Sequence, residues 1–531
     1  MHRRLRRRHG GSGLLAGRIH RRSEETWRPG RRQDLSESRP LRTAARLRGR
    51  RAGVAECETD VTHGHLLEPT ARPVGELSPD DLELQRYLLD LSLQPLDRFD
   101  GFAHIEQYLL SALRYQLNYA CYALALAQYG YTPAFTGYLT EAQANTIEKM
   151  RDKKVWGYWA HECLLGYQRW DPDPIKFANV MYTGFFGAMI AMFETLNDDR
   201  FSKPGALTLR WNDDTEYVYE FSSLCEAIVH NMDISDHGPL YPCEPRLIYP
   251  MCNAFSLSTL LAHDRLHGTD YSADRVEQMA QAFLDHRYLR PDNRFLACRG
   301  PFKFYMGPSV GNDGVMSYWL DFAMPDQATK TFENLRENLL EVTDDDVKLQ
   351  ATPWETLDPG NYTRGTGMSR VSVMAAAKEH GDNDLADALE HSLDKRYQVV
   401  RQNGARAYAG ISSWGNAGHV LARFTTKRAM AHLLAGEVPP PWRSGPILQQ
   451  AAYPDVLVAR AVTDGRALDL VLRPGNHGGR TVLGIGRLAP QHDYLVTGGV
   501  DEKVTADYDG TALLTVDLDD RREVMLRPLD P

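Results

Sequence analysis

The stretch HIEQYLLSALRYQLNYACYALALAQYG, residues 104–130, indicates the fold class of this chain. Its apolar residues recur at intervals of three and four positions, which is the period of an amphipathic α-helix, and Gly130 supplies a helix stop. Similar segments follow at 140–151, 174–197, 222–232, 253–267, 274–285, 310–323, 326–341, 366–380, 383–397 and 417–435. We expect these helices to pair as hairpins and to close into an α/α toroid with a central cavity.

Two segments follow the alternating pattern of β-strands instead. The stretch LTLRWNDDTEYVYEF at 207–221 predicts a single β-hairpin among the helices, with its turn at Asn212–Asp214. After the proline-rich segment PPPWRSGP at 439–446, short alternating runs are bounded by Gly, Asn and Asp. These runs predict a small C-terminal antiparallel β-sandwich-like domain. The expected division is a helical catalytic domain at 73–438 and a β domain at 446–531.

The charge of the chain is distributed unevenly. Residues 1–55 contain 17 arginines, no lysine and 4 acidic residues, whereas the full chain of 531 residues has a net charge of −9. Because this head has almost no apolar periodicity, we expect residues 1–72 to be a disordered arginine-rich leader, with an RNA-binding or membrane-touching tail as the alternative. The rest of the chain is acidic, which disfavours a nucleic-acid partner.

Cysteine usage and hydropathy predict the compartment. The seven cysteines form no CxxC pair and have no metal-ligand spacing; they are Cys57, Cys121, Cys163, Cys225, Cys243, Cys252 and Cys298. Such a sparse, odd set is typical of reduced thiols, so we expect a cytoplasmic protein without a metal. There is no secretory signal pattern and no run of about 18 apolar residues, so we expect no membrane span.

The segment YPCEPRLIYPMCN, residues 241–253, sets two cysteines nine positions apart. Pro245 and Pro250 prevent one uninterrupted helix between them, so we expect a loop that either brings the two thiols together or simply contains them. If Asn253 or the residue before it caps the next helix, Cys252 lies at a helix N-terminus, where the helix dipole lowers the pKa of a thiol. Two buried structural cysteines, or a disulfide between them, are the alternatives.

Two further neighbourhoods contain candidate residues. The segment 153–186 is rich in aromatic side chains, including Trp156 and Tyr182, which can wall an apolar pocket or belong to ordinary core. The segment 300–323 has a glycine-rich helix entry with Asp313, followed by Trp319. The Asp313 carboxyl can be a helix cap, or a general acid or base if it faces an apolar cavity.

Four motifs resemble the linalool dehydratase-isomerase family in order and spacing. They are KKVWGYW at 153–159, DPI with NVMY at 173–182, the segment CEPRLIYPMCN, and DRLHGTDYSA at 264–273. The resemblance covers roughly residues 100–330. It implies an (α/α)6 barrel and an enzyme that dehydrates and isomerises a monoterpenoid allylic alcohol without a cofactor. It also implies that Cys243 and Cys252 belong to the active site.

The chain departs from this family at several positions. The family's active-site histidine, in a segment MYKGH, corresponds to Phe185 in MYTGF, and its pocket tyrosine falls near Asp313. Its catalytic aspartate corresponds to Asp90 or Asp97. Asp152 replaces a cysteine that precedes the KRVWG motif, which removes one half of a disulfide that the family has. These differences affect the expected substrate, linalool, more than the expected class of chemistry.

Together these observations predict a cofactor-independent lyase or isomerase acting on a terpenoid or polyene allylic alcohol in an apolar cavity. The expected catalytic residues are Cys243, Cys252, Asp313 and Asp90. The expected substrate-binding residues are Trp156, Tyr182, Phe185, Glu244, Asn253 and Trp319. A polysaccharide lyase or glycoside hydrolase with paired carboxylates and a non-catalytic binder of hydrophobic metabolites are the alternatives, and a homo-oligomer is compatible with each.

Overall fold

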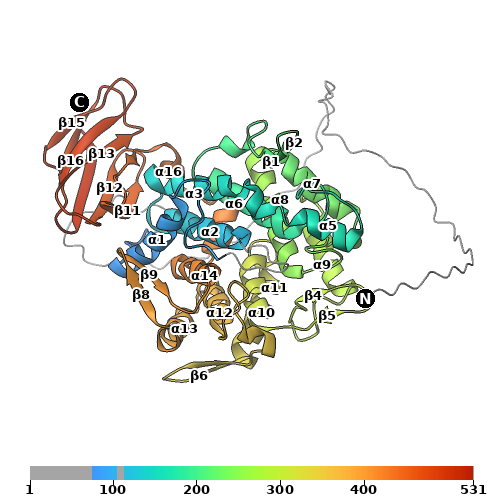
Figure 1. The fold of residues 1–531 in the computed structure, drawn as a ribbon. Helices are drawn as coiled ribbons and strands as arrows, with labels where there is room; N and C mark the ends of the chain where they lie inside the picture. The colour runs from blue at the N-terminus through green and yellow to red at the C-terminus, as the bar shows by residue number, and fades with distance from the viewer. Residues whose placement is uncertain (1–73, 104–112, 530–531) are drawn as a thin grey trace, which may run out of the picture. The chain divides into compact units, whose positions relative to one another are not determined.

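The computed structural model describes residues 74–103 and 113–529 (Figure 1). The predicted leader at 1–72 lies outside these residues. The helices are α1 (Pro79–Ser92), α2 (Leu113–Tyr131), α3 (Gly137–Met150), α4 (Lys153–Trp156), α5 (Trp159–Tyr167), α6 (Val180–Leu196), α7 (Phe221–Asp233), α8 (Pro250–His267), α9 (Arg275–Asp285), α10 (Val310–Leu320), α11 (Pro325–Asn338), α12 (Gly367–His380), α13 (Asn383–Arg396), α14 (Ser413–Phe424), α15 (Ala429–Leu434) and α16 (Pro440–Ser444).

Within the described residues, six helices contact one another in a closed ring. Helix α2 packs on α6, and the ring continues through α8, α10, α12 and α14, which returns to α2. A second set of helices packs on the outside of this ring: α1, α3, α7, α9, α11 and α13. Almost every residue of α2 and α6 is buried, as expected for helices that have neighbours on every side.

Two glycines allow the close packing of α6 against α8. A Cβ atom at Gly184 would lie 2.9 Å from the backbone nitrogen of Ser256, and one at Gly187 would lie 2.3 Å from Thr259 Cγ2. The Thr259 hydroxyl also donates a hydrogen bond to the Gly184 carbonyl at 2.9 Å. This contact fixes the position of Phe185, between the two glycines, against the first half of α8.

Several predicted helices have different bounds in the structure. Residues 174–179 are not helical, because Ala178 and Asn179 have positive φ angles of 53° and 59°, and α6 begins at Val180. The helix predicted at 253–267 begins earlier, at Pro250. The helix predicted at 417–435 is two helices, α14 and α15, separated by Arg428 with a φ of 55°.

The predicted hairpin at 207–221 is present as strands β1 (Leu209–Asn212) and β2 (Thr215–Tyr217). The structure adds three two-stranded hairpins among the helices: β4 (Cys298–Arg299) with β5 (Tyr305–Met306), β6 (Leu340–Val342) with β7 (Val347–Leu349), and β8 (Val399–Gln402) with β9 (Ala405–Tyr408). A short strand, β3 (Asp236–Pro239), follows α7. Short strands of this kind have too few alternating positions to be recognised in the sequence.

The C-terminal region consists of antiparallel strands, as predicted. One sheet has the order β10 (Ile447–Gln450), β13 (Arg480–Gly486), β16 (Ala512–Asp517). The other has the order β11 (Val456–Thr463), β12 (Leu468–Pro474), β17 (Arg522–Pro528), β14 (Asp493–Thr497), β15 (Lys503–Thr505). Strands β10 and β17 were not expected from the sequence pattern.

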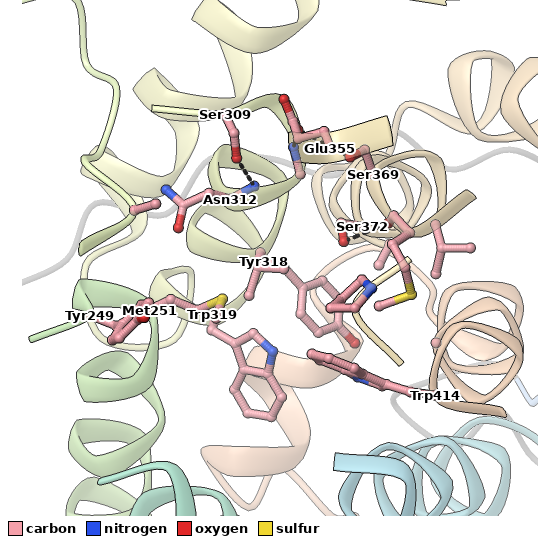
Figure 2. A pocket seen from close by; sticks show the side chains of 18 of the residues that line it. Tyr249, Met251, Ser309, Asn312, Tyr318, Trp319, Glu355, Ser369, Ser372 and Trp414 are labelled. Carbon is pink, nitrogen blue, oxygen red and sulfur yellow. Dashed lines mark hydrogen bonds between the residues drawn. The ribbon is translucent and has the colours of Figure 1, made fainter. Parts of the chain in front are cut away.

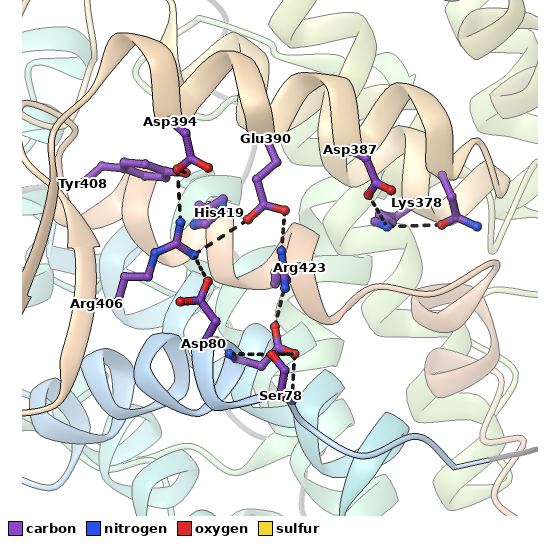
Figure 3. A network of polar contacts seen from close by, with 12 residues as sticks. Ser78, Asp80, Lys378, Asp387, Glu390, Asp394, Arg406, Tyr408, His419 and Arg423 are labelled. Atoms are coloured by element: carbon purple, nitrogen blue, oxygen red, sulfur yellow. Dashed lines mark hydrogen bonds and ion pairs between the residues drawn. The ribbon is translucent and has the colours of Figure 1, made fainter.

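A network of charged side chains joins α1 to α13, α14 and β9 (Figure 3). Arg423 on α14 donates to Asp81 on α1 at 2.8 Å and also to Glu390 on α13. Arg406 on β9 donates to Asp80 at 2.8 Å and to Asp394 at 3.1 Å. The first described helix is therefore held against segments more than 300 residues later in the chain.

No helix among the described residues combines the length and the apolar character needed to cross a membrane.

Candidate active site

The cysteine segment enters α8 through Pro250, which occupies the first helical position after Tyr249. Proline is favourable there because its missing N–H would have no helical partner. The expectation that Asn253 or its predecessor caps the helix is therefore wrong, since Asn253 lies inside the first turn. Cys252 is still at the N-terminal end of α8, as expected.

The two thiols are in contact. The Sγ atoms of Cys243 and Cys252 lie 3.4 Å apart, and each side chain is only 2% exposed. Both cysteines are free, and their separation is far beyond the roughly 2.05 Å of a disulfide bond. The arrangement is a buried S–H···S hydrogen bond, in which either thiol can be the donor.

Asn253 fixes both ends of the segment that carries Cys243. Its Oδ1 accepts a hydrogen bond from the Tyr241 N–H at 3.0 Å, and its Nδ2 donates to the carbonyls of Tyr241 at 3.1 Å and Tyr249 at 3.0 Å. Between these points, the Cys243 N–H donates to the Leu247 carbonyl at 2.8 Å and closes a tight turn. Asn253, predicted to bind substrate, instead clamps the turn that places the thiol.

Electrostatics keep the Cys243 thiol protonated. Burial is the largest effect and raises the pKa of Cys243 well above its usual value; the hydrogen bond with Cys252 and the nearby Glu244 carboxylate act in the same direction. The Arg114 guanidinium opposes them without reversing the result. At neutral pH, Cys243 is therefore a proton donor and not a thiolate.

Helix α2 contributes two side chains that the sequence analysis did not select. Arg114 is buried with its guanidinium over the rings of Tyr115 and Tyr158, at 4.5 Å and 4.3 Å from their centroids. The Tyr115 hydroxyl lies 3.4 Å from Met181 Sδ, and burial raises the pKa of Tyr115 well above its usual value. The sequence signal was present: an arginine in a helix whose other residues are nearly all apolar or aromatic.

A continuous stack of aromatic rings fills the centre of the ring of helices. Phe185 lies flat on Phe255 with 3.8 Å between centroids, and Phe255 contacts Trp319 at the same distance. Tyr115 meets Phe185 edge-on at 5.6 Å and stacks on Trp414 at 4.5 Å. Phe185 and Trp319, both predicted to bind substrate, therefore belong to one aromatic cluster.

A cavity of about 320 Å³ lies beside this cluster (Figure 2). Trp319, Tyr318 and Trp414 form its aromatic side, and Ser309, Asn312, Glu355, Ser369 and Ser372 supply polar groups. Tyr249 and Met251, which flank the start of α8, also line it, whereas neither Cys243 nor Cys252 is among its lining residues. We call this space the aromatic cavity.

Tyr119 connects the aromatic cavity to the thiols. It lines the cavity, and burial raises its pKa, with Cys252 close enough to raise it further. Tyr119 also meets Trp414 edge-on at 5.9 Å. The thiol pair thus lies next to the end of the cavity formed by Tyr119, Tyr249 and Met251.

Asp313 is buried at the start of α10 but faces away from the cavity. Its carboxylate accepts hydrogen bonds from Arg294 at 2.7 Å and from the Phe295 N–H at 3.1 Å. Burial raises the pKa of Asp313 to about 6, against the lowering effect of Arg294. Asp313 is not a lining residue, so the structure assigns it to holding the 290–295 turn.

Four other predicted residues have contacts or exposure that the structure describes. Asp90 is exposed and accepts a hydrogen bond from Tyr453, and Asp97 is exposed as well. Trp156 donates to the Arg151 carbonyl at 2.9 Å and packs beside Trp211. Tyr182 donates to the Met150 carbonyl at 2.8 Å. Neither Trp156 nor Tyr182 lines the aromatic cavity.

Glu244 is the carboxylate that the structure brings to the thiols. It follows Cys243 directly, is 8% exposed and raises the pKa of Cys243. Within the described residues, no three His, Cys, Asp or Glu side chains gather in a way that could hold a metal ion. The site therefore combines two thiols, one carboxylate and one guanidinium beside an aromatic cavity.

The fold and site define an α-helical enzyme-like protein with a buried thiol pair. The chain belongs to the linalool dehydratase/isomerase family, because the family model matches residues 114–414, more than half of the chain. The match includes both cysteines, Glu244, Arg114 and Trp414.

Several solved structures are similar to this chain at low sequence identity. The α-1,6-mannanase GH76A of Salegentibacter sp. HEL1_6 is 11% identical, with a TM-score of 0.43, over 66% of this chain and 99% of its own. Dfg5 from Chaetomium thermophilum is 11% identical, with a TM-score of 0.39, over 68% and 91%. Cellobiose 2-epimerase from Bacillus thermoamylovorans B4167 is 11% identical, with a TM-score of 0.38, over 65% and 98%.

Proposed function

We propose that this protein is a cofactor-independent hydro-lyase and isomerase of a terpenoid-like allylic alcohol. The observation that carries the proposal is the pair of free, buried thiols 3.4 Å apart, next to an aromatic cavity. We also propose that the closed ring of helices is the (α/α)6 barrel of this family, spanning 73–438, and that 446–531 is a separate β-sandwich-like domain. Family membership supports the chemistry, and the contacts of the six ring helices support the barrel.

The proposed dehydration requires one proton donor and one proton acceptor. The Cys243 thiol donates its proton to the substrate hydroxyl, the C–O bond breaks, and water leaves an allylic cation. A proton on the adjacent carbon then passes to the resulting thiolate, either directly or through Cys252, which gives a diene and restores the thiol. In the isomerisation, water adds to the other end of the allylic cation, and the proton that the added water loses passes to the Cys243 thiolate, which gives the isomeric alcohol and restores the thiol.

The raised pKa of Cys243 supports its role as the acid. A thiol that remains protonated in the resting enzyme has a proton available for the leaving hydroxyl, and the contact with Cys252 provides a path for its return. Glu244 takes the carboxylate role that the sequence analysis gave to Asp313 and Asp90, because it lies beside Cys243 and they do not. Its charge also stabilises a cation forming near the thiols.

The aromatic cluster supports a hydrophobic substrate. Phe185, at the position of the family's histidine, stacks on Phe255, and Phe255 contacts Trp319, which lines the aromatic cavity. An aromatic lining of this kind favours an apolar chain. Aromatic faces also attract the positive charge of an allylic cation. We therefore propose a substrate more apolar than one that would use a histidine at this position.

The glycoside hydrolase alternative needs two carboxylates facing the substrate. Among the described residues that line the aromatic cavity, Glu355 is the only carboxylate, and it accepts hydrogen bonds from the Gly311 N–H at 2.7 Å and the Ser369 hydroxyl at 3.1 Å. This geometry does not favour paired-carboxylate chemistry in that cavity.

The proposal is tested by incubating the purified protein with a panel of terpenoid alcohols and measuring products by mass spectrometry. We expect a product lighter than the substrate by one water for at least one allylic alcohol, and none for the saturated analogue. Release of sugars from an oligosaccharide panel would support the glycoside hydrolase alternative. Binding of the alcohols without turnover would support the non-catalytic alternative.

A further inference from the structure

A second cavity, of about 330 Å³, lies beside the cysteine segment, and among the described residues it shares no lining residue with the aromatic cavity. Tyr241, Pro242, Arg246 and Ile248, all from the turn that carries Cys243, form one of its sides. Arg299 and Gly300 of the β4–β5 hairpin form another, and His237 on β3 forms a third. The proposed reaction uses none of these side chains. We call this space the arginine cavity.

The charge of the arginine cavity is not balanced by its own residues. It contains two guanidinium groups, from Arg246 and Arg299, and one carboxylate, from Asp236. Among the described residues, no carboxylate lies within ion-pair distance of either guanidinium, and the buried Arg299 Nε has no hydrogen-bond partner. Arg299 is half-buried and Arg246 is exposed. Most other buried or half-buried arginines among the described residues, such as Arg294, have a carboxylate partner.

Neighbouring groups hold the cationic side chains in place. The Arg299 guanidinium lies 5.7 Å from the centroid of the Tyr288 ring, and the Tyr288 hydroxyl is 3.3 Å from His237 Nδ1. The Arg246 N–H donates to the Tyr167 hydroxyl at 3.1 Å, which fixes the backbone from which the Arg246 side chain projects. Tyr288 therefore supports the Arg299 guanidinium, whereas Tyr167 holds the backbone of Arg246, whose side chain is exposed.

The positive charge of the arginine cavity also affects the pKa of His237. Burial lowers the pKa of His237, and the neighbouring His286 and Arg299 lower it further, while Asp236 opposes them. The rest of the lining is apolar or aromatic and includes Tyr167, Phe177, Ile234 and Ile248. A ligand that matches both the guanidinium groups and the apolar lining has a negatively charged oxygen group and a compact apolar body.

We propose that the arginine cavity binds a small organic oxyanion, with its carboxylate or phosphate group between Arg246 and Arg299. Arginine is suited to this role because its planar guanidinium donates two parallel hydrogen bonds to such a group. The inference stands apart from the proposed dehydration, since the thiols and the aromatic cavity take no part in it.

The test is isothermal titration of the full chain with three probes: sodium hexanoate, inorganic phosphate and hexan-1-ol. We expect saturable binding of hexanoate and at least tenfold weaker binding of hexan-1-ol, which has the same apolar body without the charge. Phosphate that competes with hexanoate would assign the site to phosphate groups as well as carboxylates. Phosphate that does not compete would assign it to organic carboxylates.

Two variants locate the binding. Arg246→Gln and Arg299→Gln should each weaken hexanoate binding about tenfold or more, because each removes a charge-assisted hydrogen bond. The control is Arg210→Gln on β1, an exposed arginine outside the cavity, which makes the same change in net charge. Melting curves verify that each variant is folded. The proposal is overturned if hexanoate does not bind the wild-type protein, or if it binds both cavity variants as tightly as the control.

Discussion

Replacing Asn253 with alanine tests whether this side chain holds the turn that brings Cys243 and Cys252 into contact. The substitution removes three hydrogen bonds of 3.0–3.1 Å that hold Tyr241 and Tyr249 at the two ends of the cysteine turn. At about 1 kcal/mol for each bond, the expected loss in free energy of unfolding is about 3 kcal/mol. Asn253 is fully buried, so water does not replace the lost partners without local opening.

The same substitution should expose the thiols. In the wild-type protein Cys243 and Cys252 are buried and should react slowly with a thiol reagent under native conditions. Once the turn is released, we expect two thiols of the Asn253→Ala variant to react at least tenfold faster. The assays are urea unfolding followed by fluorescence and native thiol titration with peptide mapping of the modified cysteines.

Asn416 provides a matched control. Its Oδ1 accepts from the Tyr408 N–H at 2.7 Å, and its Nδ2 donates to the carbonyls of Tyr408 and Ile411 at 3.1 Å. Asn416→Ala should therefore cost a similar free energy of unfolding without accelerating modification of Cys243 and Cys252. Equal thiol reactivity in the two variants, or a loss below about 1 kcal/mol for Asn253→Ala, would refute the clamp.

Three further predictions concern the rest of the molecule. Burial would raise the pKa of Glu390, but its contacts with His419 and Arg423 hold this pKa at about 2, so the ionised Glu390 stabilises the fold above the unfolded pKa of 4.5 and this stabilisation is lost as pH falls towards 2. The difference in urea midpoint between the wild type and Glu390→Gln should therefore shrink between pH 7 and pH 3. A constant difference would contradict the network. Asp313→Ala leaves Arg294 without its partner and should cost about 3 kcal/mol, while native thiol titration stays unchanged; faster thiol modification would show that Asp313 supports the thiols after all. Asp90→Asn should leave both dehydration and thiol reactivity at the wild-type level because Asp90 is exposed and bonded to Tyr453, and a large loss of turnover would return Asp90 to the site.

The parts of the fold that could be predicted are those with a strong local pattern. The long apolar repeat of α2 and the alternating runs after residue 446 depend on neighbours in sequence, so their period is readable. The sequence pattern did not predict where helices are interrupted at Asn179 and Arg428, because the positive φ angles of these residues reflect tertiary contacts. Asn179, for example, accepts from the Tyr158 hydroxyl at 2.8 Å, a contact that no local pattern encodes.

The residues of the candidate site also fall into those that a local pattern predicts and those that only tertiary contacts place. The contact between the thiols followed from the family motif and two prolines, although Pro250 opens a helix and does not break one. The glycine-rich helix entry around Asp313 is compatible with a catalytic role, but Asp313 pairs with Arg294 of the preceding turn and is not among the residues that line the cavity. Arg114 and Trp414 lie 300 positions apart in the chain, so only the closed ring of helices brings them to one site.

The most direct measurement of the central claim is the dehydration rate of the Cys243→Ser and Cys252→Ser variants on the best alcohol of the panel. Serine keeps the size of the side chain but is a far weaker acid, so we expect each variant to fold normally and to lose turnover by roughly 100-fold or more. Cys225→Ser is the matched control, since Cys225 is also a free, fully buried cysteine but lies on α7. Variants at Cys243 and Cys252 that retain the activity of the Cys225→Ser control would contradict the account.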